Sequence, residues 1–228
     1  MTNRLLYNFR LMRTLTDGEP ARGRHAILIA LLSGTYSEPE DFVREGFPEA
    51  VRAHGIDADL VMAEVRAAWF ADGSIVRRIS ESVVQPAKAR GHERVWLAGV
   101  SLGGLAALSY AARHEEDVAG IVLISPYPAT RDVLREMEAA GGLGEWKPVI
   151  PPEGDLEREA WLWLAQREDG GPPVHCYFAS GDRFAEGQRR MAGAIAPDRV
   201  RELPGGHDWK AWRALWDAFL ANGKGDLR

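Results

Sequence analysis

Short apolar runs alternate with helix-like stretches along most of the chain, and this alternation constrains the fold more than any other feature. Apolar runs of this length are typical of buried β-strands, and helices between them are typical of βαβ units. The strand candidates are His25–Gly34, Ala58–Val65, Glu93–Val100, Val118–Pro126, Val174–Ser180 and Arg199–Pro204. The sequence therefore predicts an α/β fold with a mostly parallel central sheet flanked by helices.

Helical patterns fill most of the intervals between these strand candidates, from the second strand candidate onward. Residues 127–173 interrupt the alternation, because they hold two further helix candidates and a loop rich in Gly and Pro instead of a strand. No linker or repeat divides the sequence, so we expect a single domain over residues 1–228 with 127–173 as a small helical cap or lid. The helix candidates are Ser74–Arg90, Leu102–His114, Thr130–Ala140, Leu156–Arg167, Phe184–Ile195 and Asp208–Ala221.

Composition narrows the partners that the chain can have. Hydrophobic residues make up 46% and charged residues 27%, which is ordinary for a globular protein. The net charge of −5 argues against nucleic acid as the main partner. No apolar run reaches the roughly 18 residues that a membrane span needs, and no secretory signal is recognisable. Cys176 is the single cysteine, and a chain that cannot form an internal disulfide fits a reducing compartment, so we expect a cytoplasmic protein. We expect its partner to be a small molecule rather than a nucleic acid or a membrane.

A G-x-S-x-G motif, Gly99-Val100-Ser101-Leu102-Gly103, stands between a strand candidate and a helix candidate. Such a turn holds its serine in a strained conformation above the edge of the sheet, where the hydroxyl can act as a nucleophile. The alternative is a glycine-rich turn whose serine only caps the helix. No nucleotide-binding glycine motif is present in the sequence. The motif therefore predicts Ser101 as a catalytic nucleophile.

A serine nucleophile needs a base, and the base needs an orienting acid. His207 follows two glycines in the loop after the last strand candidate, whereas His175 lies at the start of a strand candidate and is expected to be structural. Asp182 follows the strand candidate Val174–Ser180, at the edge where catalytic groups gather in parallel sheets. Asp208 is expected to cap the final helix. We therefore predict His207 as the general base and Asp182 as the acid that orients it.

Two backbone N–H groups are candidates for the oxyanion hole. Leu102 follows the serine at the positive end of a helix, so its N–H is the first donor. The second is expected in the turn after Gly34, from Thr35 or Tyr36, and we assign it to Thr35. The alternative is that this segment is a simple strand-ending turn.

Eight tryptophans are present, and they fall into two groups of interest. Trp161 or Trp163, in the helical interruption, is a candidate to line an acyl or aromatic pocket. Trp209, Trp212 and Trp216 recur at helical spacing and are expected to belong mainly to the core. No cluster of His, Cys and Glu has the sequence spacing of a metal site, so no metal and no cofactor are predicted.

These residues resemble the α/β-hydrolase superfamily, and G-G-H-D-W at Gly205–Trp209 is similar to its esterase-like branch of feruloyl-type and other carboxylesterases. The resemblance also rests on G-V-S-L-G-G at Gly99–Gly104 and S-G-D at Ser180–Asp182. It implies ester hydrolysis through an acyl-enzyme by a Ser101–Asp182–His207 triad, without a cofactor. One departure is Ser33-Gly34, where many members carry His-Gly before the oxyanion donor.

Two alternative functions remain compatible with the sequence. The same triad serves thioesterases and acyltransferases, which differ in substrate or in the group that accepts the acyl chain. The other alternative is a non-catalytic, ligand-binding member of the fold. The substrate's acyl and alcohol groups and the oligomeric state do not follow from the sequence.

Overall fold

A seven-stranded sheet forms the centre of the molecule. The computed structural model describes residues 11–17, 26–148, 154–167 and 170–227. The strand order is β1-β3-β2-β4-β5-β6-β7, and within the described residues β1 alone runs antiparallel to its neighbour. The predicted α/β fold with a mostly parallel sheet is confirmed. The strands are β1 (Thr14–Thr16), β2 (Ile27–Leu32), β3 (Asp59–Ala63), β4 (Arg94–Val100), β5 (Gly120–Ile124), β6 (Val174–Ala179) and β7 (Val200–Leu203).

Each of the six predicted strands contains an observed one, although His25, at the start of the first, lies outside the described residues. Strand β1 was not predicted. It is three residues long and largely exposed, so it lacks the apolar run that identifies the others. Its antiparallel pairing with β3 adds an edge strand to an otherwise parallel sheet.

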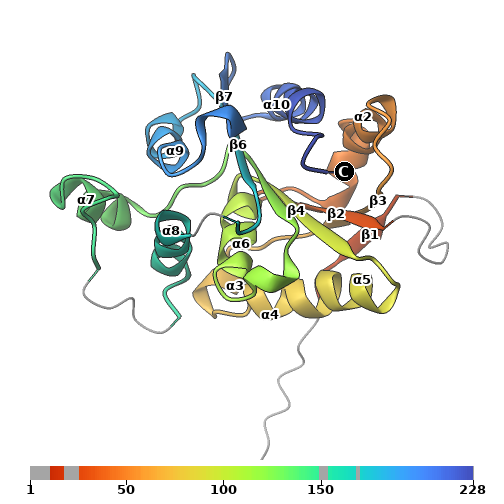
Figure 1. Ribbon diagram of the computed structural model, residues 1–228, viewed down its shortest axis with the longest axis horizontal. Helices are drawn as coiled ribbons and strands as arrows, with labels where there is room; N and C mark the ends of the chain where they lie inside the picture. Colours follow the sequence, from red (N-terminus) through yellow and green to blue (C-terminus); the bar gives the residue numbers. More distant parts are fainter. Residues whose placement is uncertain (1–10, 18–25, 149–153, 168–169, 228) are drawn as a thin grey trace, which may run out of the picture.

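Helices cover both faces of the sheet (Figure 1). One face packs against α1 (Pro39–Arg44), α2 (Phe47–Ala53) and α10 (Trp209–Asn222). The other packs against α4 (Ile75–Ile79), α5 (Gln85–Ala89), α6 (Leu102–Ala111) and α8 (Leu156–Gln166). The two faces give two separate clusters of buried apolar side chains, as a sheet buried on both sides requires. The remaining helices are α3 (Ala68–Ala71), α7 (Arg131–Ala139), α9 (Ala185–Ala192) and the 3-10 turns η2 (Glu115–Asp117) and η3 (Pro197–Arg199).

The predicted helix Ser74–Arg90 has a widened turn in its middle. Its α-helical ends, α4 and α5, flank a π-helical segment, η1 (Ser80–Val84). Pro86, in the first turn of α5, has no N–H to donate to the preceding turn. The widened turn therefore falls where proline interrupts the regular hydrogen-bond pattern.

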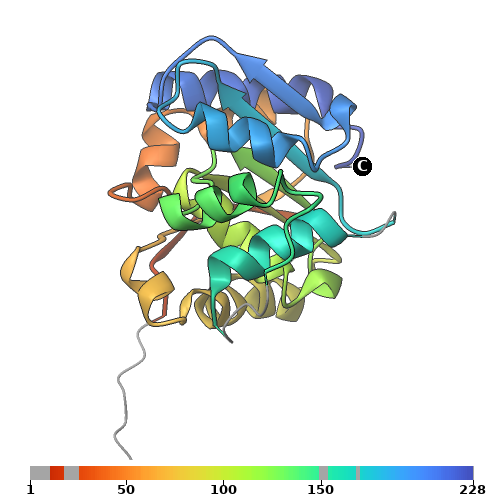
Figure 2. The ribbon, with the colours of Figure 1, turned by 90° about the vertical axis from the view of Figure 1, so that its left-hand side faces the viewer.

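Residues 127–173 form helices α7 and α8, close to the predicted bounds, while residues 149–153 and 168–169 of this segment lie outside the described part. The apolar side of α8 is buried in the same cluster as α6. Figure 2 shows α7, α8 and α9 along one side of the molecule. The role of this segment as a cap stays a prediction. None of the described helices is long and apolar enough to cross a membrane.

The contact between β4 and β5 generates a prediction about stability. Gly120 pairs in register with Trp96, and a Cβ on Gly120 would lie 2.3 Å from the ring of this fully buried tryptophan. We expect Gly120→Ala to lower the free energy of unfolding by about 1–3 kcal/mol, because the ring has no space to withdraw.

Chemical denaturation measures this change. Gly144→Ala is the matched control, because its Cβ would meet nothing within 4 Å and its φ is not positive. Equal stability of the two variants would contradict the packing argument.

Candidate active site

Ser101 occupies a strained turn between β4 and α6. Its φ of 51° and ψ of −117° are unusual for a residue other than glycine. Its N–H donates to the carbonyl of Ile124 at 3.1 Å, and its own carbonyl accepts from the N–H of Tyr127 at 2.8 Å. Hydrogen bonds to the end of β5 and to the segment that follows it therefore hold the strained backbone in place.

Glycines are required around this turn for steric reasons. A Cβ on Gly99 would lie 2.1 Å from the carbonyl oxygen of Gly103, and one on Gly103 would lie 2.2 Å from that of Leu32. A Cβ on Gly104 would lie 2.9 Å from Cβ of Pro126. The glycines of the G-x-S-x-G-G motif thus let α6 approach the ends of β2, β4 and β5.

The structure brings the three predicted side chains together. The Nε2 atom of His207 lies 2.9 Å from Ser101 Oγ, and its Nδ1 atom lies 2.7 Å from Asp182 Oδ2. When Nδ1 carries the proton, the ring donates to Asp182 and accepts from the Ser101 hydroxyl. The three residues follow β4, β6 and β7, whose carboxyl ends lie at the same edge of the sheet.

The imidazole ring of His207 is held by two aromatic side chains. Phe184 and Trp212 meet it edge to face, with ring centroids 5.2 Å and 5.0 Å away. The ring itself is 11% exposed. Its orientation is therefore set by packing as well as by its two polar contacts.

Asp182 is kept ionised by a set of hydrogen bonds. Burial alone would raise its pKa, but bonds from His207, from the Phe184 N–H at 2.8 Å and from the Gln188 amide at 3.1 Å outweigh burial, and the pKa lies below its ordinary value. Gln188 is itself fully buried and also donates to the Pro126 carbonyl. Gln188 was not predicted from the sequence, because a single glutamine on a helix carries no motif.

The other two candidates for acid and base have structural roles, as expected. The Asp208 carboxylate accepts from the N–H of Ala211 at 2.9 Å and caps α10. His175 is buried in β6, where burial lowers its pKa and its Nε2 lies 2.9 Å from Asp226. Within the described part of the chain, neither Asp208 nor His175 forms a hydrogen bond with Ser101.

The two predicted oxyanion donors lie at the same cavity. Leu102 is the first residue of α6, so its N–H has no acceptor within the helix. Thr35 lies in a turn closed by a bond from the Ser37 N–H to the Gly34 carbonyl. A Cβ on Gly34 would lie 3.3 Å from Ser101 Cβ, so this turn is directly beside the serine.

Ser33, which precedes Gly34 in the turn after β2, has a defined contact. It is fully buried, and its Oγ accepts from the N–H of Val65 at 2.9 Å. The bond ties the turn after β2 to the segment after β3. Ser33 therefore stabilises the turn that carries Thr35.

A cavity of about 520 Å³ opens at Ser101. Trp212 lines it, but Trp161 and Trp163 do not. Trp161 is buried and donates to the Pro128 carbonyl, and Trp163 donates to Glu115. The residues that line the cavity are Thr35, Tyr36, Ala67, Phe70, Ser101, Leu102, Leu105, Tyr127, Glu157, Arg183, Phe184, His207 and Trp212. Its wall is therefore apolar and largely aromatic, with charged groups at Glu157 and Arg183.

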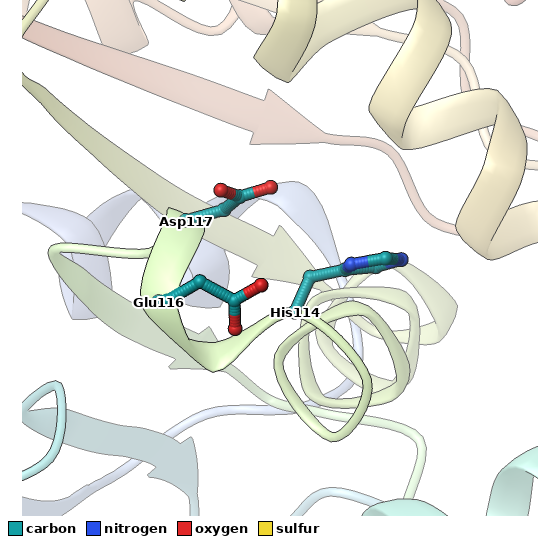
Figure 3. Close-up of side chains that lie close together, drawn as sticks. All are labelled: His114, Glu116 and Asp117. Atoms are coloured by element: carbon teal, nitrogen blue, oxygen red, sulfur yellow. The ribbon is translucent and has the colours of Figure 1, made fainter.

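One cluster of a histidine and two acidic residues elsewhere has ligand atoms as close together as in a metal site, but one of its acidic groups already has partners in the protein. Ligand atoms of His114, Glu116 and Asp117 lie within 4.8 Å of one another (Figure 3), which the sequence spacing did not indicate. Asp117 already accepts from Lys88 and from the Tyr110 hydroxyl. The cluster is thus explained by contacts within the protein.

Cys176 is buried in β6, as expected. Burial raises the pKa of its thiol to about 12, so the thiolate does not form near neutral pH.

The profile of a protein family named Esterase and described as "Putative esterase" matches residues 77–222. Similar solved structures include S-formylglutathione hydrolase from Staphylococcus aureus, with a TM-score of 0.61 and 14% identity over 85% of this chain and 79% of that one. Est1E from Butyrivibrio proteoclasticus has a TM-score of 0.64 and 15% identity over 94% and 93% of the two chains. A comparison with curated protein sequences gives no match.

The low pKa of Asp182 predicts how stability depends on pH. A carboxyl group whose pKa is lowered by folding stabilises the native state above its unfolded pKa of about 4, and this contribution is lost as pH falls through the folded value. We expect Asp182→Asn to be less stable than the wild type at neutral pH, with the difference narrowing as pH falls below about 4.

Denaturant titrations at several pH values measure the difference. Asp132→Asn, whose side chain is 86% exposed on α7, is the control and should follow the wild type throughout. A constant gap between Asp182→Asn and the wild type would show that the contacts of Asp182 do not favour its ionised form.

Proposed function

This chain belongs to the Esterase family, and from that premise we propose that it cleaves carboxylic esters through an acyl-enzyme formed on Ser101. The match over residues 77–222 and the fold agree with the expected resemblance to the α/β-hydrolase superfamily, which is confirmed. The protein is an ester-hydrolysing enzyme of the serine hydrolase class. The proposal concerns which residues act and how.

The observation that carries the proposal is the position of His207 between Ser101 and Asp182, at 2.9 Å and 2.7 Å. In the first step Ser101 Oγ attacks the ester carbonyl carbon while Nε2 of His207 takes the hydroxyl proton. The ionised Asp182 holds the ring and stabilises the imidazolium. The N–H groups of Leu102 and Thr35 stabilise the negative charge that forms on the carbonyl oxygen.

The tetrahedral intermediate then collapses to an acyl-enzyme, which water hydrolyses. His207 gives its proton to the leaving alcohol, and the acyl group stays on Ser101. A water molecule then loses a proton to His207 and attacks the acyl carbon. The acid departs and the proton returns to Ser101.

We also propose that residues 127–173 act as a cap on the substrate side of the site. Two members of this segment, Tyr127 and Glu157, line the cavity at Ser101. The remainder of α8 is packed against α6. The segment would therefore shape the cavity wall rather than contribute a catalytic group.

The assignment of Ser101 is tested by covalent labelling. We expect a fluorophosphonate to add once to the wild type and not to Ser101→Ala, because only the serine activated by His207 attacks phosphorus. Turnover of a 4-nitrophenyl ester should fall by about 10⁴-fold or more in the same variant.

Intact mass and steady-state kinetics give the two measurements. Ser180→Ala is the matched control, because Ser180 is an exposed serine near Asp182 and should label normally. An adduct on folded Ser101→Ala would overturn the assignment.

The assignment of Thr35 is tested by removing only its N–H. Proline has no N–H to donate, so we expect Thr35→Pro to lower kcat about 10²-fold, while Thr35→Ala, which keeps the N–H, stays near the wild-type value. Circular dichroism checks that both variants fold. Similar kcat values for the two variants would exclude the Thr35 N–H and favour that of Tyr36.

A further inference from the structure

A second cavity adjoins the one at Ser101. Its volume is about 420 Å³, and it lies between α7 and α9, which are neighbours in Figure 2. The two cavities share three lining residues: Tyr127, Arg183 and Phe184. A substrate that reaches Ser101 can therefore extend past these residues into the second cavity, which we call the arginine groove after Arg131, Arg135, Arg183 and Arg190.

The arginine groove carries excess positive charge. It contains four arginines but two acidic residues, Glu138 and Glu186. Both acids face the same arginine, because Arg190 lies 2.8 Å from Glu186 and 3.6 Å from Glu138. The balance within the groove is thus opposite in sign to the net charge of −5 of the whole chain.

The positive charges of the other three arginines are balanced weakly or not at all by acidic groups among the described residues. Arg135 has one ion pair, a 4.0 Å contact with the exposed Asp132. Arg183 places its guanidinium over the Phe184 ring, 4.8 Å from the centroid. Neither Arg183 nor Arg131 has a hydrogen bond or ion pair to another of the described residues. Their N–H donors are therefore available to a ligand.

The cavity at Ser101 has a different electrostatic character. Its carboxylate, Glu157, accepts two hydrogen bonds at 2.8 Å from the backbone and side chain of Thr130. Apart from Glu157 and Arg183, the second of which it shares with the arginine groove, its wall is largely apolar and aromatic. A negative group on the substrate would be repelled beside Glu157 and attracted into the arginine groove.

We propose that the arginine groove binds a carboxylate carried by the acyl or alcohol part of the ester, with Arg183 as the contact nearest to Ser101. A guanidinium binds a carboxylate through two parallel hydrogen bonds, and stacking on Phe184 leaves its in-plane N–H donors free. The preferred substrates are thus esters with one apolar portion at Ser101 and one anionic end in the groove. This inference rests on the proposed function, because the reacting bond must lie at Ser101.

The test compares matched esters. One pair is 4-nitrophenyl hydrogen adipate against its neutral methyl ester, which places the charge on the acyl side. The other is the acetate of 6-hydroxyhexanoic acid against its methyl ester, which places the charge on the alcohol side. The readout is the ratio of kcat/KM for the charged ester to that for the neutral ester. It is measured from release of 4-nitrophenol in the first pair and of acetate in the second, because each methyl ester adds a second cleavable bond.

We expect the wild type to prefer the charged member of at least one pair. Arg183→Gln and Arg131→Gln should each lower that ratio about 5- to 10-fold, mainly through KM, as is typical of a lost charged hydrogen bond at a partly exposed site. Arg183→Lys should keep part of the preference. Glu186→Gln should raise the ratio, because it leaves Arg190 less compensated. High salt should reduce the preference of the wild type.

Arg44→Gln is the control, because this exposed arginine on α1 lines neither cavity. The rate of fluorophosphonate labelling shows whether each variant keeps an active Ser101. If the variants label normally and neither Arg183→Gln nor Arg131→Gln changes the ratio in either pair, the inference is wrong while the proposed function stands. If the wild type neither labels nor cleaves any ester, the proposed function itself fails.

Discussion

Only hydrogen atoms fit between the backbones at the junction of β4 and α6. The hydrogens of Gly99 and Gly103 occupy positions where a Cβ would lie 2.1–2.2 Å from a carbonyl oxygen. This contact forces Ser101 into its unusual backbone conformation, and bonds to Ile124 and Tyr127 hold it there. The position of the serine hydroxyl thus depends on three neighbouring strands rather than on a flexible loop, which is how strain can be maintained at a site.

The parallel sheet sets the remaining geometry. Because β4, β6 and β7 all end at the same edge, residues that follow them can meet although 106 positions separate Ser101 from His207. At this edge, burial and hydrogen bonding act on the pKa of Asp182 in opposite directions. Burial works against its charge, and the bonds from His207, Phe184 and Gln188 outweigh burial. Phe184 and Trp212 also contact the imidazole, and Trp212 belongs at the same time to the buried apolar cluster on one face of the sheet.

Charge is distributed differently on the two sides of the cavity. The chain is acidic overall, yet α7, α9 and the turn before α9 bring four arginines to one groove beside the Ser101 cavity. The segment that breaks the βαβ alternation contributes Arg131 and Tyr127 to this region, whereas the regular strands support the reacting groups. The fold therefore places the proposed reacting groups at the sheet edge and the groove that we propose for substrate recognition beside them.

The amino-acid sequence was sufficient to predict the α/β class, the six parallel strands and Ser101, Asp182 and His207 as candidate site residues. These follow from local patterns, because burial on a sheet imposes apolar runs and a tight strand–helix turn requires glycine. It did not indicate β1, the π-helical turn before Pro86, Gln188 or the arginine groove. The π-helical turn has a local cause in Pro86, but a proline in a helical pattern does not by itself show which turn will widen. Strand β1, the bonds of Gln188 and the arginine groove depend on contacts between segments distant in the chain, and neither residue spacing nor composition encodes which side chains will meet.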